Sequence, residues 1–196
     1  VMFLGDYIYE YPGSRNAVRP SLLGWTLTLA DYRARYALYK SDLDLQAMHA
    51  ACPWLMTWDD HEVQNNYANL TAGYPGPATN FVERRAAAYQ AYYENMPLRA
   101  SVLTKALKGM AGGAEMRIYN AQPFGSLATL YLLDGRQYRD PQACTKGGRL
   151  GGGTVNPAAC ATWDDPKRTL LGMAQEQWLD QAFNRSSGHW NVVGQQ

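Results

Sequence analysis

The sequence has almost no net charge and lacks any long hydrophobic run. Its 18 Lys and Arg residues nearly balance its 17 Asp and Glu residues, which gives a formal net charge of +1. Because proteins whose main partner is nucleic acid carry a strong basic excess, this balance argues against a nucleic-acid-binding module. No apolar stretch approaches the roughly 20 residues of a transmembrane helix, so we expect no transmembrane segment. No charged and apolar leader precedes the first residues, so we expect any export signal to lie outside this chain.

Cysteine is also scarce, with three residues in the chain. Cys144 and Cys160 flank the Gly-rich stretch TKGGRLGGGTVNPAA, which has too few apolar residues to hold itself in place. A disulfide that closes a loop of about 15 residues stabilises a fold by on the order of 3 kcal/mol. We therefore expect a Cys144–Cys160 disulfide, which indicates an oxidising compartment. Cys52 is expected to be a small buried hydrophobic residue.

The residues that are present predict one α/β domain. At 196 residues, 46% of them hydrophobic, the chain can bury one substantial core. Helical patterns, two of them parted near Ser41, alternate with apolar strand-like runs, which is typical of a layered α/β fold with a central sheet. The expected helices cover 28–51, 81–96 and 170–187, and the expected strands lie within 1–7, 53–60, 115–138 and 189–196. Both ends of the chain fall in strand-like runs, which predicts a piece of a longer domain.

Three of the expected strands end in aspartate, in the sequences LGD, TWDD and LLD. Ligands of α/β sheets gather outside the strand ends, so these acids are expected to converge on one edge of the sheet. The first of them, Asp6, is followed three residues later by Tyr9. A carboxylate can bridge two cations, whereas a phenol, which loses its proton near pH 10, becomes a ligand only beside a strongly acidic cation. The pair therefore indicates a metal site, with aromatic packing at a strand end as the alternative.

The second acidic strand end begins TWDDHEVQNNY, which places Asp59, Asp60, His61 and Glu62 directly after an apolar run. Such a density of polar groups beside a core indicates a charge that they neutralise. The zinc motif H-E-x-x-H is excluded because position 65 is Asn. The alternative is an aspartate helix cap followed by a solvated turn.

Several segments in order resemble the alkaline phosphatase D (PhoD-like) family of the metallophosphoesterase superfamily. They are LGDYIYE, TWDDHEVQNNYA, RRAAAYQAYYENMPLR, LLDGRQYRDPQAC and RTLLGMAQEQWL, and the similarity covers nearly the whole chain. The resemblance implies a metallophosphoesterase-like β-sandwich flanked by helices, incomplete here. Residues 1–196 would then be part of a single catalytic domain that lacks its N-terminal and C-terminal segments. It also implies a secreted or periplasmic phosphomonoesterase or phosphodiesterase that uses Fe³⁺ and Ca²⁺, with a phosphate ester as substrate.

The resemblance also implies a set of metal ligands. Asp6 would bridge iron and calcium, and Tyr9 would bind iron as a phenolate. Asp60 stands where relatives outside the family place an Asn ligand, and Asn66 would lie near calcium and the phosphate. The family supplies a cysteine ligand before this chain and aspartate and histidine ligands after it. We therefore expect the 196-residue chain alone to be inactive.

For the substrate, the resemblance implies that His61 contacts the phosphate or the leaving group and that Arg85 clamps the phosphate, which suits a guanidinium fork. The implied mechanism is in-line displacement by water or a bridging oxygen that the cations activate. His61 would protonate the leaving oxygen, with Glu62 or Asp59 fixing its orientation. The other histidines, His49 and His189, are expected to be structural.

Two other functions fit the same residues. An aromatic-rich surface, with 14 tyrosines and 6 tryptophans in the chain, is typical of a protein that binds sugars or peptides. A calcium-stabilised module without catalysis would use the same acids.

Overall fold

The computed structural model describes residues 1–74, 76–77, 80–104, 114–145 and 153–196. Helices and strands alternate along the chain, which confirms the α/β class. The helices are α1 (Leu29–Lys40), α2 (Leu43–Ala51), α3 (Phe81–Asn95) and α4 (Met173–Asn184), with single 3₁₀ turns at Ala100–Val102 and Pro157–Ala159. The strands are β1 (Met2–Phe3), β2 (Leu55–Met56), β3 (Asn120–Phe124), β4 (Ala128–Leu132) and β5 (Trp190–Gly194).

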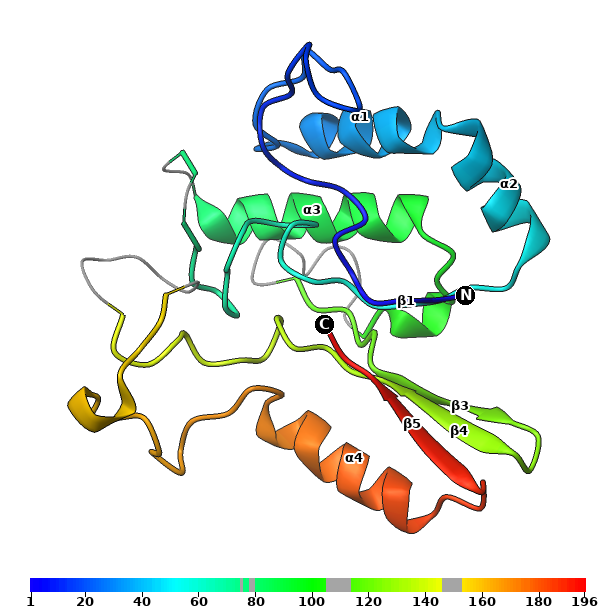
Figure 1. The fold of residues 1–196 in the computed structure, drawn as a ribbon, viewed down its shortest axis with the longest axis vertical. Helices are drawn as coiled ribbons and strands as arrows, with labels where there is room; N and C mark the ends of the chain where they lie inside the picture. Colours follow the sequence, from blue (N-terminus) through cyan, green and yellow to red (C-terminus); the bar gives the residue numbers. More distant parts are fainter. Residues whose placement is uncertain (75, 78–79, 105–113, 146–152) are drawn as a thin grey trace.

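The strands form two small sheets. In the first, β1 and β2 run parallel, with Met2 paired to Leu55 and Phe3 to Met56. In the second, β4 is central, antiparallel to β3 and parallel to β5. Figure 1 shows α1, α2 and α3 on one side of these strands and α4 on the other.

The two sheets are joined where β2 and β4 end. Thr57 Oγ1 donates a hydrogen bond to the carbonyl oxygen of Leu133 (2.8 Å), and Leu133 N donates to Gly194 O (3.0 Å). The loops that follow β2 and β4 therefore start from the same region, although the two strands belong to different sheets.

Polar caps set the limits of the first two helices. Thr28 and Asp31 form a reciprocal capping box at the start of α1, in which Thr28 N and Oγ1 both donate to Asp31 Oδ2 (2.8 Å each) and Asp31 N donates to Thr28 Oγ1. Helix α1 ends at Lys40, and Asp42 caps α2 by accepting from Leu45 N (2.9 Å). The predicted break near Ser41 is confirmed.

Most of the tyrosines lie in the core, which argues against the alternative of an aromatic-rich binding surface. Trp58 stacks on Tyr89 of α3 with ring centroids 4.3 Å apart and meets the edge of Tyr92 at 5.2 Å. Eight of the 14 tyrosines are buried: Tyr7, Tyr32, Tyr36, Tyr67, Tyr89, Tyr92, Tyr119 and Tyr131. Such rings supply large apolar areas inside the fold, so they leave a sugar- or peptide-stacking surface little support.

A disulfide joins Cys144 and Cys160, with Cα atoms 5.7 Å apart. The Gly-rich insert between them lies partly outside the described residues. Cys52 is a free thiol. It is half-buried, so the expectation of a buried residue was wrong.

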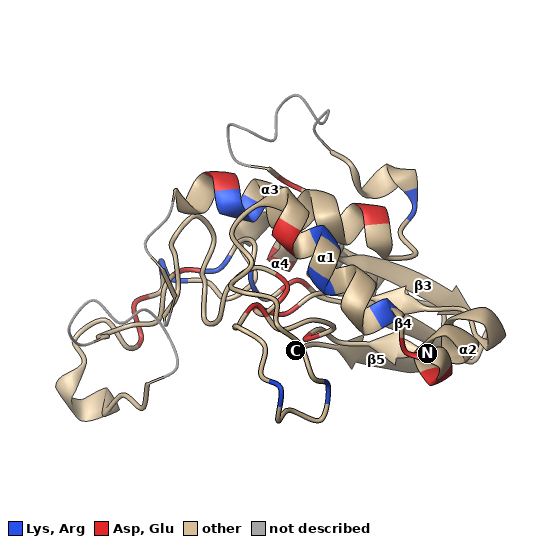
Figure 2. Cartoon of the chain, turned by 90° about the horizontal axis from the view of Figure 1, so that it is seen from above, with Lys and Arg blue, Asp and Glu red and all other residues tan. Residues whose placement is uncertain are grey.

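None of the described helices has the length and hydrophobicity of a membrane-spanning helix. The longest of them, α3, has 15 residues and carries several charges. Figure 2 shows basic and acidic residues interspersed, as the net charge of +1 leads us to expect.

Candidate metal centre

The parallel pairing of β1 and β2 brings two acidic loops together. Both strands run in the same direction, so the chain leaves them at the same edge, with Asp6 on the first loop and Asp60 and His61 on the second. Each of these three residues offers one ligand atom, and the three atoms all lie within 4.8 Å of one another. Asp60 and His61 are buried, with 4% and 9% exposure. Two of the three predicted acidic strand ends thus converge.

The backbone conformation of the first acidic loop lets it lie close to the second. Asp6 has a φ of +58°, in the left-handed region that few residues other than glycine adopt. Its neighbour Gly5 has a φ of +108° and lies against the backbone of the second loop, so that a Cβ on Gly5 would be 2.3 Å from Asp59 N. Uncommon backbone conformations of this kind collect at functional sites, where the surrounding contacts maintain them.

Glu62 ties the two loops together. Its carboxylate accepts hydrogen bonds from Tyr7 N at 2.6 Å and from Asp59 N at 2.9 Å, one on each loop. The side chain is buried, and burial raises the pKa of Glu62 to about 8. Since both carboxylate oxygens are used in this way, Glu62 holds the loops in register and does not orient His61 as predicted.

Tyr9 lies beside Asp6, as their spacing predicts. Its hydroxyl donates to Asp6 Oδ2 (3.1 Å), and its ring lies on that of His61 with centroids 4.2 Å apart. Burial, followed by the charge of Asp6, raises the pKa of Tyr9 to about 12. The phenol therefore keeps its proton at neutral pH beside the carboxylate alone.

Glu10 is the residue that orients His61. Glu10 is fully buried, and its Oε2 lies 2.6 Å from His61 Nδ1. Burial lowers the pKa of His61, but the hydrogen bond and charge of Glu10 outweigh it and raise the pKa overall. The prediction that Glu62 or Asp59 fixes this imidazole was wrong, because both of those carboxylates bond elsewhere.

Arg136 joins the site from the segment that follows β4. Its Nε lies 2.5 Å from Asp59 Oδ1, and its Nη2 lies 3.4 Å from Asp60 Oδ2. Burial raises the pKa of Asp59, an effect that Arg136 partly offsets. Sequence reasoning missed this arginine, although it lies in the segment LLDGRQY.

The third strand-end acid, Asp134, lies outside the cluster, which corrects the expected convergence of three acids. It is fully buried and accepts hydrogen bonds from Trp58 Nε1 (3.0 Å), Arg136 N (3.0 Å) and Gln137 N (2.9 Å). Asp134 therefore shapes the turn that delivers Arg136.

The residues present fit a hard cation. Asp6 Oδ1 is buried and has no hydrogen-bond partner, an arrangement that is costly for a carboxylate oxygen unless a cation satisfies it. Carboxylate and phenol oxygens suit hard cations, whereas a structural zinc site favours thiolates and several histidines.

Comparisons with known proteins show the family to which the chain belongs. A family description, PhoD-like phosphatase, matches residues 1–196. The chain belongs to the PhoD-like phosphatase family. A relative described as alkaline phosphatase D, from Bacillus subtilis (strain 168), is 47% identical over 201 residues, which covers 100% of this chain and 32% of the relative. A solved structure described as "Structure of PhoD" superposes with a TM-score of 0.78 at 43% identity, over 98% of this chain and 35% of that one.

This PhoD-like chain thus spans about a third of the length of the relatives that it matches. The other two predicted site residues, Asn66 and Arg85, differ in whether they contact the acids of the cluster. Asn66, with a φ of +58°, donates its backbone N–H to Asp60 Oδ2 at 2.6 Å. Arg85 is 3% exposed, donates from Nε to the Tyr89 hydroxyl at 3.0 Å and lies over that ring. Arg136, rather than Arg85, contacts the acids of the cluster, and the roles of Asn66 and Arg85 stay predictions.

Proposed function

We propose that this PhoD-like protein is a metal-dependent phosphoric ester hydrolase, an alkaline phosphatase or phosphodiesterase that uses Fe³⁺ and Ca²⁺. The observation that carries the proposal is the buried, unpartnered Oδ1 of Asp6, whose other oxygen accepts from the Tyr9 phenol. A buried carboxylate oxygen without a partner, beside a phenol and a second acid, supports the proposal that Asp6 would hold a cation.

Four residues would hold these cations. Asp6 would bridge them, Tyr9 would bind Fe³⁺ as a phenolate, Asp60 would be a further ligand, and Asn66 would lie near Ca²⁺ and the phosphate. When bound, the cations supply positive charge that lowers the pKa of water and stabilises the phosphoryl oxygens. Arg136, already paired with Asp60, holds that carboxylate in place at 3.4 Å.

The chain's own residues would bind and turn over the ester. Hydrolysis is an in-line displacement, in which a water oxygen bonds to phosphorus as the ester oxygen departs on the opposite side. His61 would protonate the departing oxygen, and Arg85 would hold the phosphoryl oxygens. His61 is suited to this role because its Nδ1 is occupied by Glu10, which leaves Nε2 as the free nitrogen.

We also propose that residues 1–196 alone are inactive and that the protein is secreted or periplasmic. The chain spans about a third of the length of its relatives, and Asp6 and Asp60 are the ligand acids that its described part brings to the cluster. The Cys144–Cys160 disulfide supports an oxidising compartment.

The test is an assay of the full-length protein against a phosphomonoester and a phosphodiester. The protein is stripped with a chelator and then supplied with Fe³⁺, Ca²⁺ or both. We expect turnover only when both cations are restored, with the 196-residue chain as a control that shows none. Absence of turnover on both esters at every metal combination would contradict the proposal.

A further inference from the structure

Arg84, in the first turn of α3, is a buried cation without an acid beside it. Its side chain is 1% exposed. Its Nε donates to the hydroxyl of Tyr32 at 3.0 Å, but Nη1 and Nη2 are both buried and have no hydrogen-bond partner. None of the ion pairs formed among the described residues includes Arg84. Most of the donors of this guanidinium therefore lack an acceptor.

The buried acids of the chain do not neutralise this charge. A guanidinium stays charged inside proteins, and buried charges are normally paired because an isolated one is strongly unfavourable. Each buried acid in the described part of the chain bonds to other groups; these acids are Glu10, Asp60, Glu62 and Asp134. The neutralising charge therefore has to come from a bound anion.

The surroundings of Arg84 Nη1 add further positive character. A Cβ placed on Gly76 would be 3.6 Å from Arg84 Nη1 and 2.5 Å from Gln64 Nε2, so two nitrogen donors border the same point. Helix α3 begins close by in the sequence, and its N-cap residue Asn80 makes no side-chain hydrogen bond. The N-terminus of a helix carries partial positive charge. The acid of this first turn, Glu83, is exposed and forms no ion pair with Arg84.

We propose that Arg84 binds a chloride ion at Nη1 and Nη2. One guanidinium is balanced by one negative charge, whereas a phosphate group carries close to two and brings several oxygens that each need a donor. The groups around the site are enclosed, with Tyr32 at 0% and Gln64 at 3% exposure, which suits a monatomic ion. This inference goes beyond the proposed function, because it assigns a second site that takes part in no step of ester hydrolysis.

The chloride site is connected to the second acidic loop through Tyr32. The hydroxyl of Tyr32 accepts from Arg84 Nε and donates to the carbonyl oxygen of Val63 at 2.5 Å, which a hydroxyl can do at once. Val63 is fully buried and lies three residues after Asp60. An anion that fixes Arg84 therefore also supports the loop that carries Asp60, and we expect chloride to stabilise the folded protein.

The first experiment locates the ion directly. Bromide resembles chloride and can be identified by its anomalous scattering, so crystals of the full-length protein are grown in sodium bromide. We expect an anomalous peak at hydrogen-bond distance from Arg84 Nη1 or Nη2. Water molecules alone at these two nitrogens, without an anomalous peak, would overturn the proposal.

The second experiment measures thermal unfolding of the full-length protein in sodium chloride and, at equal ionic strength, in sodium methanesulfonate, whose anion is larger. A ligand that binds the folded state alone raises the folding equilibrium constant about tenfold for each tenfold increase above its dissociation constant. We expect the unfolding midpoint to rise with chloride and to stay constant with methanesulfonate. Arg84→Met should lose the chloride-dependent rise, and Arg99→Met, the same change at an exposed arginine, should keep it.

Two results would contradict a functional chloride site. An equal chloride-dependent rise in the parent and in Arg84→Met would place the effect elsewhere, and a bromide peak without any such rise in the parent would mean an adventitious ion only. The bromide map and the chloride dependence of the parent need no variant, so they decide the question even if Arg84→Met does not fold. No readout depends on turnover, so failure of this inference is distinguishable from failure of the proposed function.

Discussion

Gly5 lies directly against the backbone of Asp59. A Cβ placed on Gly5 would be 2.3 Å from Asp59 N and 2.6 Å from Asp59 Cβ, closer than real Cβ contacts come. Gly5 precedes Asp6, and Asp59 precedes Asp60, so this contact sets how closely the two acidic loops approach. Glu62 then joins the same loops by hydrogen bonds to Tyr7 N and Asp59 N.

Gly5→Ala should therefore destabilise the protein and loosen the site. The left-handed φ of +108° and the backbone clash each oppose a side chain, so we expect a loss of about 2 kcal/mol or more in the free energy of unfolding, measured by urea titration. Two control variants separate these causes. Gly125 has a positive φ and no atom within 4 Å of an added Cβ, so Gly125→Ala tests the backbone conformation alone. Gly24 has open space and no positive φ, so Gly24→Ala tests neither effect. Losses that are equal at Gly5 and Gly125 would show that the contact with Asp59 adds nothing.

Asp6→Asn should abolish most phosphoesterase turnover in the full-length protein. The amide keeps the size of the side chain but removes the charge that would bridge two cations, and even changes outside the ligand set cost roughly 10–100-fold in affinity or activity. We expect a loss of roughly 100-fold or more, with less metal bound per protein by elemental analysis. Asp180→Asn, at an exposed position of α4, is the control. Unchanged turnover and metal content in Asp6→Asn would remove this residue from the site.

The sequence predicts those features that depend on neighbouring residues. The helix break at Ser41 and the proximity of Asp6 to Tyr9 both follow from residues within a few positions of one another. The sequence alone does not show that β1 and β2 pair in parallel. Two apolar runs that each end in acid nevertheless predicted that their acids would meet.

Contacts between distant residues were not predictable in this way. Glu10 and His61 are 51 positions apart, and Arg136 and Asp59 are 77 apart, so that only the folded chain shows which acid meets which base. Glu62 or Asp59, both near His61 in the sequence, was predicted to orient it. Adjacent side chains in a turn diverge, however, and the carboxylate of Glu62 points back to the first loop.

Tyr9→Phe should remove visible absorbance from the iron-loaded full-length protein. A phenolate bound to Fe³⁺ absorbs visible light, and phenylalanine keeps the ring against His61 while removing the oxygen. Absorbance spectroscopy after loading with Fe³⁺ measures the change. Tyr74→Phe, at an exposed tyrosine, is the control and should keep the colour. A Tyr9→Phe protein that binds iron and keeps the same absorbance would contradict the phenolate ligand.

Removal of the disulfide should lower stability by on the order of 3 kcal/mol, because the bond closes a loop with a sequence separation of 16. The variant is Cys144→Ser with Cys160→Ser, compared with the parent by urea unfolding under non-reducing conditions. Cys52→Ser, at the free half-buried thiol, should cost less. A parent whose stability does not change on addition of a reductant would show that the bond adds nothing.

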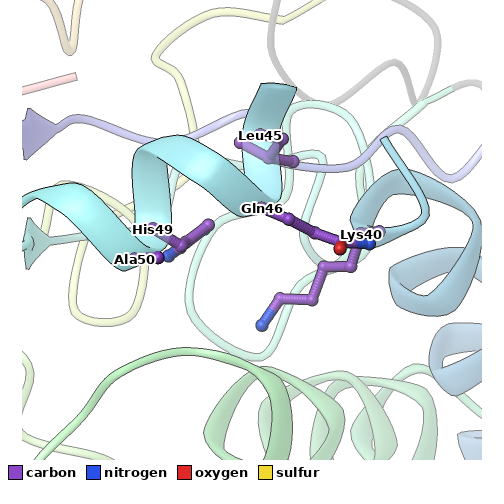
Figure 3. Close-up of a pocket in the computed structure, with 5 residues that line it drawn as sticks. All are labelled: Lys40, Leu45, Gln46, His49 and Ala50. Atoms are coloured by element: carbon purple, nitrogen blue, oxygen red, sulfur yellow. The ribbon is translucent and has the colours of Figure 1, made fainter. Parts of the chain in front are cut away.

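His49 connects a surface pocket to the first acidic loop. Its Nε2 lies 2.8 Å from the hydroxyl of Tyr7, the residue after Asp6, and its ring stacks on Trp54 with centroids 4.0 Å apart. It also lines a pocket of about 340 Å³ together with Lys40, Leu45, Gln46 and Ala50 (Figure 3). Burial, followed by the charge of Lys40, lowers the pKa of His49 from its usual 6.5.

This shift predicts that His49 makes the fold less stable in mild acid. Below about pH 6.5 the unfolded chain takes up a proton at His49 while the folded chain does not, so the contribution of His49 falls as the pH drops from 6.5 toward the folded pKa. His49→Gln keeps a hydrogen-bonding partner for Tyr7 but cannot titrate. The stability difference between parent and His49→Gln, measured by urea unfolding from pH 7.5 to 5, should therefore shift in favour of the variant. His61, whose raised pKa acts in the opposite direction, is present in both proteins and cancels. A pH-independent difference for His49→Gln would mean that burial does not suppress the protonation of His49.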